Sequence, residues 1–258
     1  MAPAGDQHAY RVTLRYDGRG YFGWQRLQDR ATIQGTLERA IEAAFGHRRK
    51  VRGASRTDRG AHAEGQVAGF LLPEPLPAEA LIQSLNAALP DDIEILDAAP
   101  APMAFHPRES ALSKVYTYRI DTREALPKRS RGRVWHHPVD LDLDLMQSAL
   151  TSIVGKLDFA SFATRPRHQQ RSTVRTMLAA TASADGPRFE IELHADSFLQ
   201  HMVRNIVRAV VRIGQGELPP EHMTDILAAR QRDASRGTAP ASGLYLTRIF
   251  YDDSDDVG

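Results

Sequence analysis

Apolar and polar side chains alternate along several short segments of the chain. In the segment 10–17 every second residue is apolar or aromatic, and the residues between them are polar. A period of two is typical of a β-strand that buries one face. Short alternating or apolar runs predict four further strands, over residues 67–72, 114–120, 189–193 and 244–251.

Other segments repeat their apolar residues every three or four positions, which is typical of amphipathic helices. Thr32 is a residue type that caps helices, and the helix it precedes is predicted to run to Phe45. A second helix is predicted to begin at Pro77 and to stop before Pro90. Three more are predicted over residues 143–154, 199–213 and 223–230.

The order of these elements predicts an α+β protein in which helices flank a large, mostly antiparallel mixed sheet. No internal repeat and no low-complexity linker is visible. We predict an N-terminal half over residues 9–105 and a C-terminal half over residues 106–251. Residues 1–8 and 252–258 are predicted to be flexible termini.

Composition narrows the class of protein. The chain has 258 residues and no cysteine, which excludes disulfides, thiolate catalysis and cysteine-based zinc sites. It lacks a run of 18 apolar residues, so no membrane span is expected, and its first residues do not look like a secretory signal. These features fit a cytoplasmic protein.

The net charge is only +1, but the charges are segregated along the sequence. Basic residues gather in three stretches, 47–52, 123–133 and 165–175, whereas acidic residues gather at 140–144 and in the tail. Segregated charge can give a nearly neutral protein one basic face, which suits a nucleic-acid partner. Ordinary solvated surface is the alternative for any single stretch.

The segment Gly53–His62 is the strongest candidate for chemistry. It places the carboxylate of Asp58 between Arg56 and Arg59 in a turn bounded by glycines. Flanking guanidiniums favour an ionised carboxylate and offer forked donors for phosphate oxygens. The segment therefore combines a candidate nucleophile with a candidate grip on nucleic acid; the alternative is a solvated loop with a salt bridge.

Three arginines, Arg204, Arg208 and Arg212, fall four residues apart on the otherwise apolar helix predicted over 199–213. This spacing puts them on one helical face. On a largely buried helix these arginines need anionic partners or a place on the wall of a cleft. The alternative is that they form a stripe of side chains that reach the solvent.

Motifs for cofactors are missing from the sequence. The histidines lack the spacing of a metal site, so no metal ligand is predicted. Neither a glycine-rich dinucleotide fingerprint nor a phosphate loop is present, and we expect no cofactor.

Six segments in order resemble the bacterial tRNA pseudouridine synthase A family, over roughly residues 10–251. The segment carrying Asp58 resembles that family's catalytic motif. The other five resemble its remaining motifs: Tyr16–Gly18 with Tyr21–Gln25, Asn86–Ile93, Phe105–Arg108 with Lys114–Tyr118, His201–Asn205 and Gly243–Leu246.

The resemblance implies a pseudouridine synthase fold, with two related halves around a central catalytic cleft. It implies isomerisation of uridine to pseudouridine at positions 38, 39 and 40 of the tRNA anticodon stem-loop, without a cofactor. It also implies a homodimer that cradles tRNA, with the target nucleotide flipped out of the stem.

The resemblance carries individual roles onto single residues. Asp58 resembles the nucleophile, and Arg56 resembles the residue that intrudes on the RNA and holds the flipped state. Tyr116 resembles the active-site tyrosine that stacks on uracil, Arg204 the arginine that pairs with the aspartate, and Leu244 the apolar pocket wall. We expect Arg59, Arg167 and Arg171 to contact RNA.

The sequence departs from the family pattern at four positions. Ser55 stands where glycine is common, Ala61 where valine is common, and Arg59 and Pro107 where alanine is usual. None of these removes a catalytic group, and Arg59 adds charge beside the nucleophile. The alternatives are a noncatalytic RNA-binding module, a hydrolase that uses Asp58, and a synthase of the same family acting on other uridines.

Overall fold

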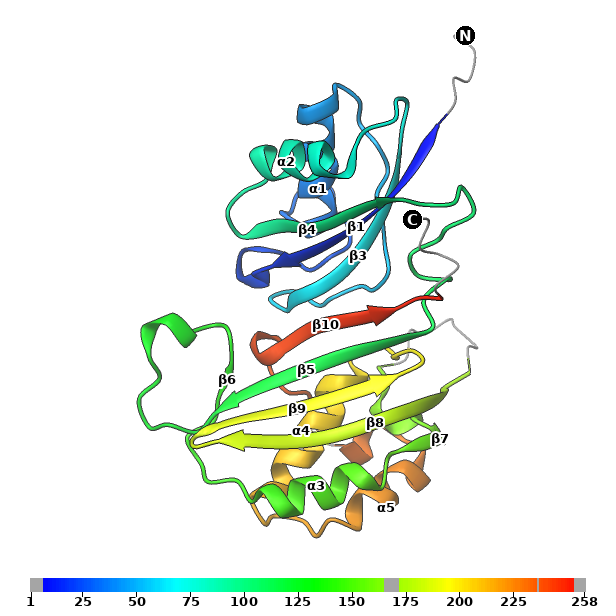
Figure 1. Cartoon of the computed structure of the whole chain (residues 1–258). Helices are drawn as coiled ribbons and strands as arrows, with labels where there is room; N and C mark the ends of the chain where they lie inside the picture. Colours follow the sequence, from blue (N-terminus) through cyan, green and yellow to red (C-terminus); the bar gives the residue numbers. More distant parts are fainter. Residues whose placement is uncertain (1–6, 165–171, 236, 253–258) are drawn as a thin grey trace. The chain divides into compact units, whose positions relative to one another are not determined.

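The computed structural model describes residues 7–164, 172–235 and 237–252. Within this part of the chain, strands and helices form two compact units (Figure 1). The first unit comprises residues 1–112 together with 246–258, and the second comprises residues 113–245. The halves predicted from sequence, 9–105 and 106–251, divide the chain at a nearby point but assign the last strand to the second half.

The first unit is built around β1 (His8–Tyr16), which pairs antiparallel with β3 (His62–Leu72) on one side and β4 (Ile93–Pro100) on the other. The two-residue strand β2 (Arg52–Gly53) also pairs with β3, and residues 246–250 of β10 (Leu244–Phe250) lie next to β3. The alternation predicted for 10–17 is confirmed, because Tyr10, Val12, Leu14 and Tyr16 are all buried.

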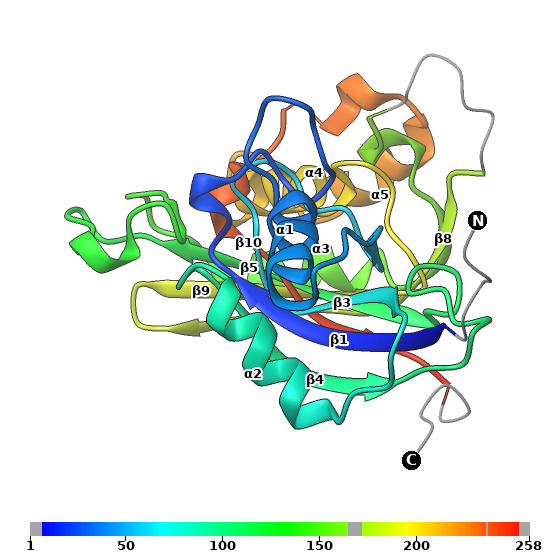
Figure 2. The same ribbon diagram turned by 90° about the horizontal axis from the view of Figure 1, so that it is seen from above.

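Two helices accompany this sheet, α1 (Ile33–Phe45) and α2 (Ala78–Ala88). They pack on each other, and α2 packs on β4; both lie beside the strands of this unit in the view from above (Figure 2). Thr32 caps α1 as predicted, since its side-chain oxygen accepts a hydrogen bond from the Gly35 amide at 3.3 Å. Gly46 closes the helix with a φ of 72°, a conformation that favours glycine.

The second unit has a sheet in the order β5 (Ser113–Asp121), β9 (Arg188–Ala195), β8 (Val174–Asp185) and β7 (Gly155–Asp158). All neighbours in this order are antiparallel. The short β6 (Trp135–His136) adds a parallel pairing to β5, so this sheet is mixed but mostly antiparallel.

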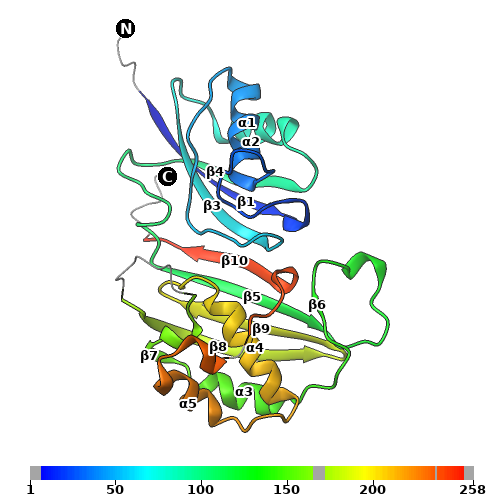
Figure 3. The ribbon, with the colours of Figure 1, turned by 180° about the vertical axis from the view of Figure 1, so that it is seen from behind.

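Three helices cover this second sheet: α3 (Leu143–Thr151), α4 (Met202–Gly214) and α5 (His222–Ala229). In the view from behind, α4 lies in front of β9 (Figure 3), and α3 packs on both α4 and β8. Helices that flank mostly antiparallel strands make an α+β fold, which confirms the predicted class.

Several element assignments from sequence were incomplete. The strands β4 and β8 were not predicted. β4 changes its alternation where its pairing with β1 shifts between Thr13 and Leu14, and β8 consists largely of small residues after Met177. The strand predicted from residue 67 begins at His62, the helix predicted to residue 154 ends at Thr151, and β1 begins at His8, inside the segment predicted to be flexible.

Candidate functional site

The loop that carries Asp58 connects β2 to β3 in the first unit, and its backbone is bonded on both sides. The Ala54 amide donates to the Val67 carbonyl at 2.8 Å, at the end toward β2. Farther along, the Ala61 amide donates to the Asp58 carbonyl at 3.1 Å, which closes a turn. Gly60 sits in this turn with a φ of 78°. Asp58 is therefore presented half-buried on a loop of fixed shape.

A buried polar cluster supports the residue before Asp58. The Thr57 and Tyr16 hydroxyl groups are hydrogen-bonded at 2.8 Å, and the Gln66 side-chain amide donates to the Tyr16 hydroxyl at 3.4 Å. Gln66 also bonds both backbone groups of Ser55: it donates to the carbonyl at 2.8 Å and accepts from the amide at 3.1 Å. Since buried polar groups of this kind specify one arrangement, the cluster fixes the loop immediately ahead of the carboxylate.

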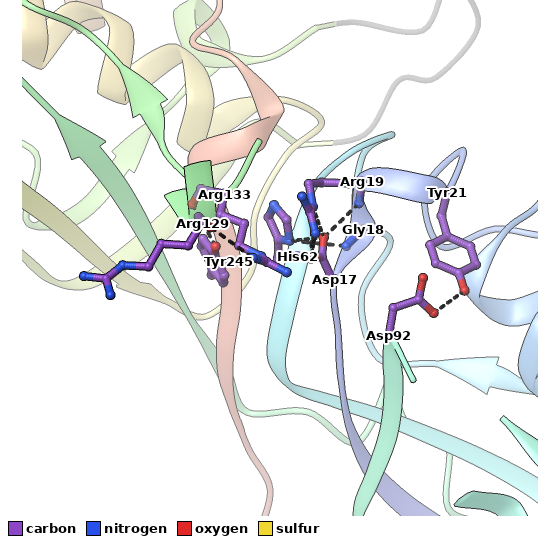
Figure 4. Close-up of polar contacts among 9 residues, drawn as sticks. All are labelled: Asp17, Gly18, Arg19, Tyr21, His62, Asp92, Arg129, Arg133 and Tyr245. Atoms are coloured by element: carbon purple, nitrogen blue, oxygen red, sulfur yellow. Dashed lines mark hydrogen bonds and ion pairs between the residues drawn. The ribbon is translucent and has the colours of Figure 1, made fainter. Parts of the chain in front are cut away.

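A second set of contacts holds the residues that follow Asp58. His62, at the start of β3, accepts a hydrogen bond through Nδ1 from the Gly18 amide at 3.2 Å, and the same atom lies 3.3 Å from Asp17 (Figure 4). Arg19 donates to both oxygens of Asp17 at 3.0 Å. The turn after β1 and the start of β3 are thereby tied together.

Tyr21 extends this framework to β4. Its hydroxyl donates to the Asp92 carboxylate at 2.6 Å, as Figure 4 shows. Burial raises the pKa of the Tyr21 hydroxyl well above its ordinary value, and the hydrogen bond to the Asp92 carboxylate raises this pKa further. Tyr21 is therefore a neutral donor.

The arginines beside Asp58 are both exposed. Arg56 projects from the same loop as the carboxylate. Arg59 lies over the ring of Phe22, with its guanidinium carbon 4.2 Å from the ring centre. The loop thus brings together three predicted site residues, Asp58, Arg56 and Arg59.

Tyr116, Arg204 and Leu244 belong to the second unit. Tyr116 is buried on β5, and its ring meets the Phe198 ring edge-on, with centres 5.0 Å apart. Leu244 is buried at the first position of β10. The predicted pairing of Arg204 with Asp58 joins residues of different units and stays a prediction.

Arg204 is held by the segment that leads into β10. Its Nε donates to the Ala239 carbonyl at 2.7 Å, and the Ala239 amide donates to the Arg204 carbonyl at 3.1 Å. The Tyr118 hydroxyl donates to the next carbonyl, that of Pro240, at 2.6 Å. Burial raises the pKa of the Tyr118 hydroxyl, and the nearby charge of Arg204 opposes that rise. One segment therefore positions Arg204 and Leu244 together.

A buried network that sequence reasoning missed organises the same segment. Asn205 is fully buried; its side-chain amide donates to the Phe162 carbonyl at 2.7 Å. Its side-chain oxygen accepts from Arg232 at 3.0 Å and from Thr238 at 2.7 Å. Arg232 has no sequence signal of its own, because it belongs to none of the periodic segments or basic stretches. Only the folded chain places it beside Asn205.

The three arginines on α4 have different surroundings. Besides Arg204, Arg208 lies over the Trp135 ring at 5.7 Å, and Arg212 pairs with Glu217 at 2.8 Å. The sequence placed them correctly on one face but did not predict three separate roles. The other two predicted RNA-binding residues, Arg167 and Arg171, lie outside the described residues.

The basic stretch 123–133 forms an ordered loop between β5 and β6. The Arg133 side chain donates to the Arg129 carbonyl at 3.0 Å, and the Arg133 carbonyl accepts from the Tyr245 hydroxyl at 2.7 Å, as drawn in Figure 4. Lys128 and Arg129 are exposed. This loop lines a cleft of about 720 Å³ together with Trp135.

Neither a metal site nor a membrane helix emerges from the part of the chain that the structure describes. It contains no group of three histidine, aspartate or glutamate side chains arranged to hold a metal ion. In the same residues, no helix has the length and apolar character needed to cross a membrane.

Comparison with known proteins gives matches along nearly the whole chain. The family model described as tRNA pseudouridine synthase matches residues 13–108 and 149–252. A protein named tRNA pseudouridine synthase A from Methylacidiphilum infernorum is 37% identical over 242 residues, covering 94% of this chain and 95% of that relative. Relatives with the same name from Caldicellulosiruptor bescii and Thermotoga maritima are 36% and 38% identical, each covering 93% of this chain and 98% of the relative.

Proposed function

This chain belongs to the tRNA pseudouridine synthase family, and we propose that it acts on uridines at positions 38, 39 and 40 of the tRNA anticodon stem-loop. As a member of this family it is an isomerase of tRNA uridines. The finer assignment to the anticodon stem-loop rests on the resemblance of the six sequence motifs to the synthase A family. Relatives with that name align over more than nine-tenths of their own length.

We propose Asp58 as the nucleophile. The reaction breaks the N1–C1′ bond of uridine, turns the uracil and forms a C5–C1′ bond. C5 loses its proton and N1 gains one, so substrate and product are isomers. A carboxylate suits this chemistry because it can add to the electron-poor sugar carbon and leave again. The observation that supports Asp58 most is its half-buried place on a loop bonded to the backbone on both sides, since a fixed nucleophile loses less entropy on reaction.

Arg56 is proposed to enter the RNA stem when the target nucleotide flips out. A uridine in a stem is inaccessible until it leaves the stack. Arg56 is exposed two residues before Asp58, so it can occupy the vacated place while the carboxylate meets the sugar.

The second unit is proposed to supply the uracil pocket. Tyr116 offers an aromatic face for stacking, and Leu244 offers an apolar wall; both are buried. Arg204 is proposed to pair with Asp58, and its hold on the Ala239 carbonyl fits a fixed orientation.

Arg59, Arg167 and Arg171 are proposed to contact the RNA backbone, and we propose that no cofactor takes part. We further propose that two copies of the chain form a homodimer around tRNA, in the cytoplasm where tRNA is used. Light scattering coupled to gel filtration tests the dimer directly: a single-chain mass at micromolar concentration contradicts it.

The decisive experiment uses unmodified tRNA and purified Asp58→Asn and Asp58→Ala proteins. We expect the parent to form pseudouridine in the anticodon stem-loop, and both variants to form none while still binding tRNA, because phosphate contacts carry most of the affinity. Asp29→Asn is the matched control, since Asp29 is an exposed carboxylate of the same unit.

The outcomes separate the alternatives. Turnover by Asp58→Asn removes Asp58 from the nucleophile role. If tRNA treated with the parent protein carries pseudouridine at other positions, the protein is a synthase of the same family with different targets. Binding without any turnover by the parent favours a noncatalytic RNA-binding module.

A further inference from the structure

Three backbone segments lie side by side next to Asp58, and Phe22 sits in the middle one. The Trp24 amide donates to the Thr57 carbonyl at 3.1 Å and the Gly60 amide to the Tyr21 carbonyl at 3.3 Å, which joins the segment 21–24 to the loop of Asp58. On its other side the Phe22 amide donates to the Ala31 carbonyl at 2.8 Å.

The contact between the first two segments is close. A Cβ atom on Gly23 would lie 2.7 Å from the Thr57 carbonyl oxygen and 3.1 Å from the carbonyl carbon of Asp58. The segment of Phe22 therefore touches the backbone of Asp58 itself. Any group fixed on Phe22 has a defined position relative to the proposed nucleophile.

Two guanidinium groups are fixed on this ring. Arg59 reaches it from the loop of Asp58, with 4.2 Å between its guanidinium carbon and the ring centre, and Arg30 reaches it from the third segment at 4.6 Å. Both arginines are exposed. Within the described residues, no carboxylate forms an ion pair with either of them.

An arginine that rests on an aromatic ring uses its flat face and leaves its N–H groups free at the edge. Those donors match two oxygens of a phosphate in a bidentate fashion. The ring also restricts the side chain in advance, which reduces the entropy lost when an anion binds. Two such groups on one ring, without carboxylate partners, are suited to a dianionic or polyanionic ligand.

We propose that Arg30 and Arg59, both held on Phe22, form a clamp for two neighbouring RNA phosphates at the target uridine. This inference rests on the proposed function of Asp58, because the clamp requires that the target nucleotide be bound at that carboxylate. It assigns binding roles to Phe22 and Arg30 and gives Arg59 a defined partner. Since the clamp grips the backbone beside the reacting sugar, it sets which nucleotide reaches Asp58.

The test measures tRNA binding in an Asp58→Asn background, where no turnover interferes, at several salt concentrations. Arg59→Ala is expected to weaken binding about tenfold at low salt, as for loss of a charge-assisted hydrogen bond. It should also lower the slope of log affinity against log salt by about one unit, and the double variant Arg30→Ala/Arg59→Ala by about two.

Arg39→Ala is the matched control, because Arg39 is an exposed arginine of the same unit on α1 that donates to the Thr36 hydroxyl at 2.9 Å. Among the described residues, it lies over no aromatic ring. We expect it to leave both affinity and slope within about twofold of the parent values. Phe22→Leu keeps both charges but removes the ring. In that background Arg59→Ala should lose most of its effect, since contacting residues are not additive.

The clamp is wrong if Arg59→Ala changes the salt slope no more than Arg39→Ala, or if the effects of Arg59→Ala and Phe22→Leu simply add. Thermal melts confirm that each variant is folded before binding is measured. A second arm follows pseudouridine formation by the Arg30→Ala/Arg59→Ala protein with Asp58 intact: a raised KM with little change in kcat is expected, whereas an unchanged KM refutes the clamp. If the parent protein forms no pseudouridine, the proposed function is refuted. The clamp is then tested by the tRNA-binding measurements alone.

Discussion

Replacing Asn205 by alanine should loosen the segment that holds Arg204 and Leu244. The change removes one hydrogen bond to the Phe162 carbonyl and the acceptor shared by Arg232 and Thr238, all in a fully buried place. A neutral hydrogen bond contributes about 0.5–1.5 kcal/mol and one with a charged donor about 1.5–3 kcal/mol. Two of the first kind and one of the second are lost, so the free energy of unfolding should fall by about 2.5–6 kcal/mol.

For a chain of this size, each kcal/mol corresponds to a shift of about 2–4 °C in Tm, so the expected fall is about 5–24 °C. Differential scanning calorimetry measures it, with Gln231→Ala as the control because Gln231 is exposed in the same segment. The kcat for pseudouridine formation should fall as well, since the Ala239 carbonyl that orients Arg204 loses its support.

The reasoning also predicts a difference between two replacements of Asn205. Asn205→Asp keeps an oxygen that can accept from Arg232 and Thr238 but loses the donor to Phe162. It should therefore melt above Asn205→Ala. A Tm for Asn205→Ala within about 2 °C of the parent, which corresponds to less than 1 kcal/mol, would show that the network does not support this segment.

Two further perturbations test the first unit. Gly18→Ala should destabilise the fold strongly, because its Cβ would lie 1.8 Å from the Ala61 carbonyl oxygen. In the control Gly20→Ala, the new Cβ meets only a side-chain oxygen of Asp92 at 3.9 Å. Thermal melts in which Gly20→Ala is the less stable of the two contradict the packing. Because the pKa of Tyr21 is raised in the folded protein, the Tyr21 hydroxyl of the unfolded chain ionises first. The stability that this hydroxyl contributes to the fold is therefore complete below pH about 10 and is lost as the pH rises further. Denaturant unfolding from pH 8 to 11 should show a smaller alkaline loss of stability for Tyr21→Phe, and an unchanged loss contradicts the sign.

The sequence allowed the strongly periodic elements to be predicted, and the reason lies in how their side chains are buried. The alternation around Val12 and the stripe of α1 follow from one buried face each. By contrast, β8 buries only Met177 and Ala180, and its other alanine, serine and threonine residues give little hydrophobic contrast. Its place between β7 and β9 comes from the tertiary fold, which local patterns do not contain.

The site could be predicted only as far as local motifs reach. The segment that contains Asp58 could be identified from the sequence, because a carboxylate between two arginines is chemically unusual. Arg232 and Asn205 lie 27 positions apart, and Phe22 and Arg59 meet through backbone pairing of distant segments. Contacts of this kind depend on chain topology, so a single sequence without its fold does not reveal them.

The first unit is discontinuous in the sequence, since residues 246–250 of β10 complete the sheet begun by β1 and β3. During synthesis at about 5–20 residues per second, the ribosome needs roughly 7–27 s to make the intervening residues 113–245. Over that interval the stretch of β3 that β10 later covers stays open beside β2, and its unpaired backbone groups can join a neighbouring chain. The half bearing Asp58 therefore becomes complete only when β10 has left the ribosome.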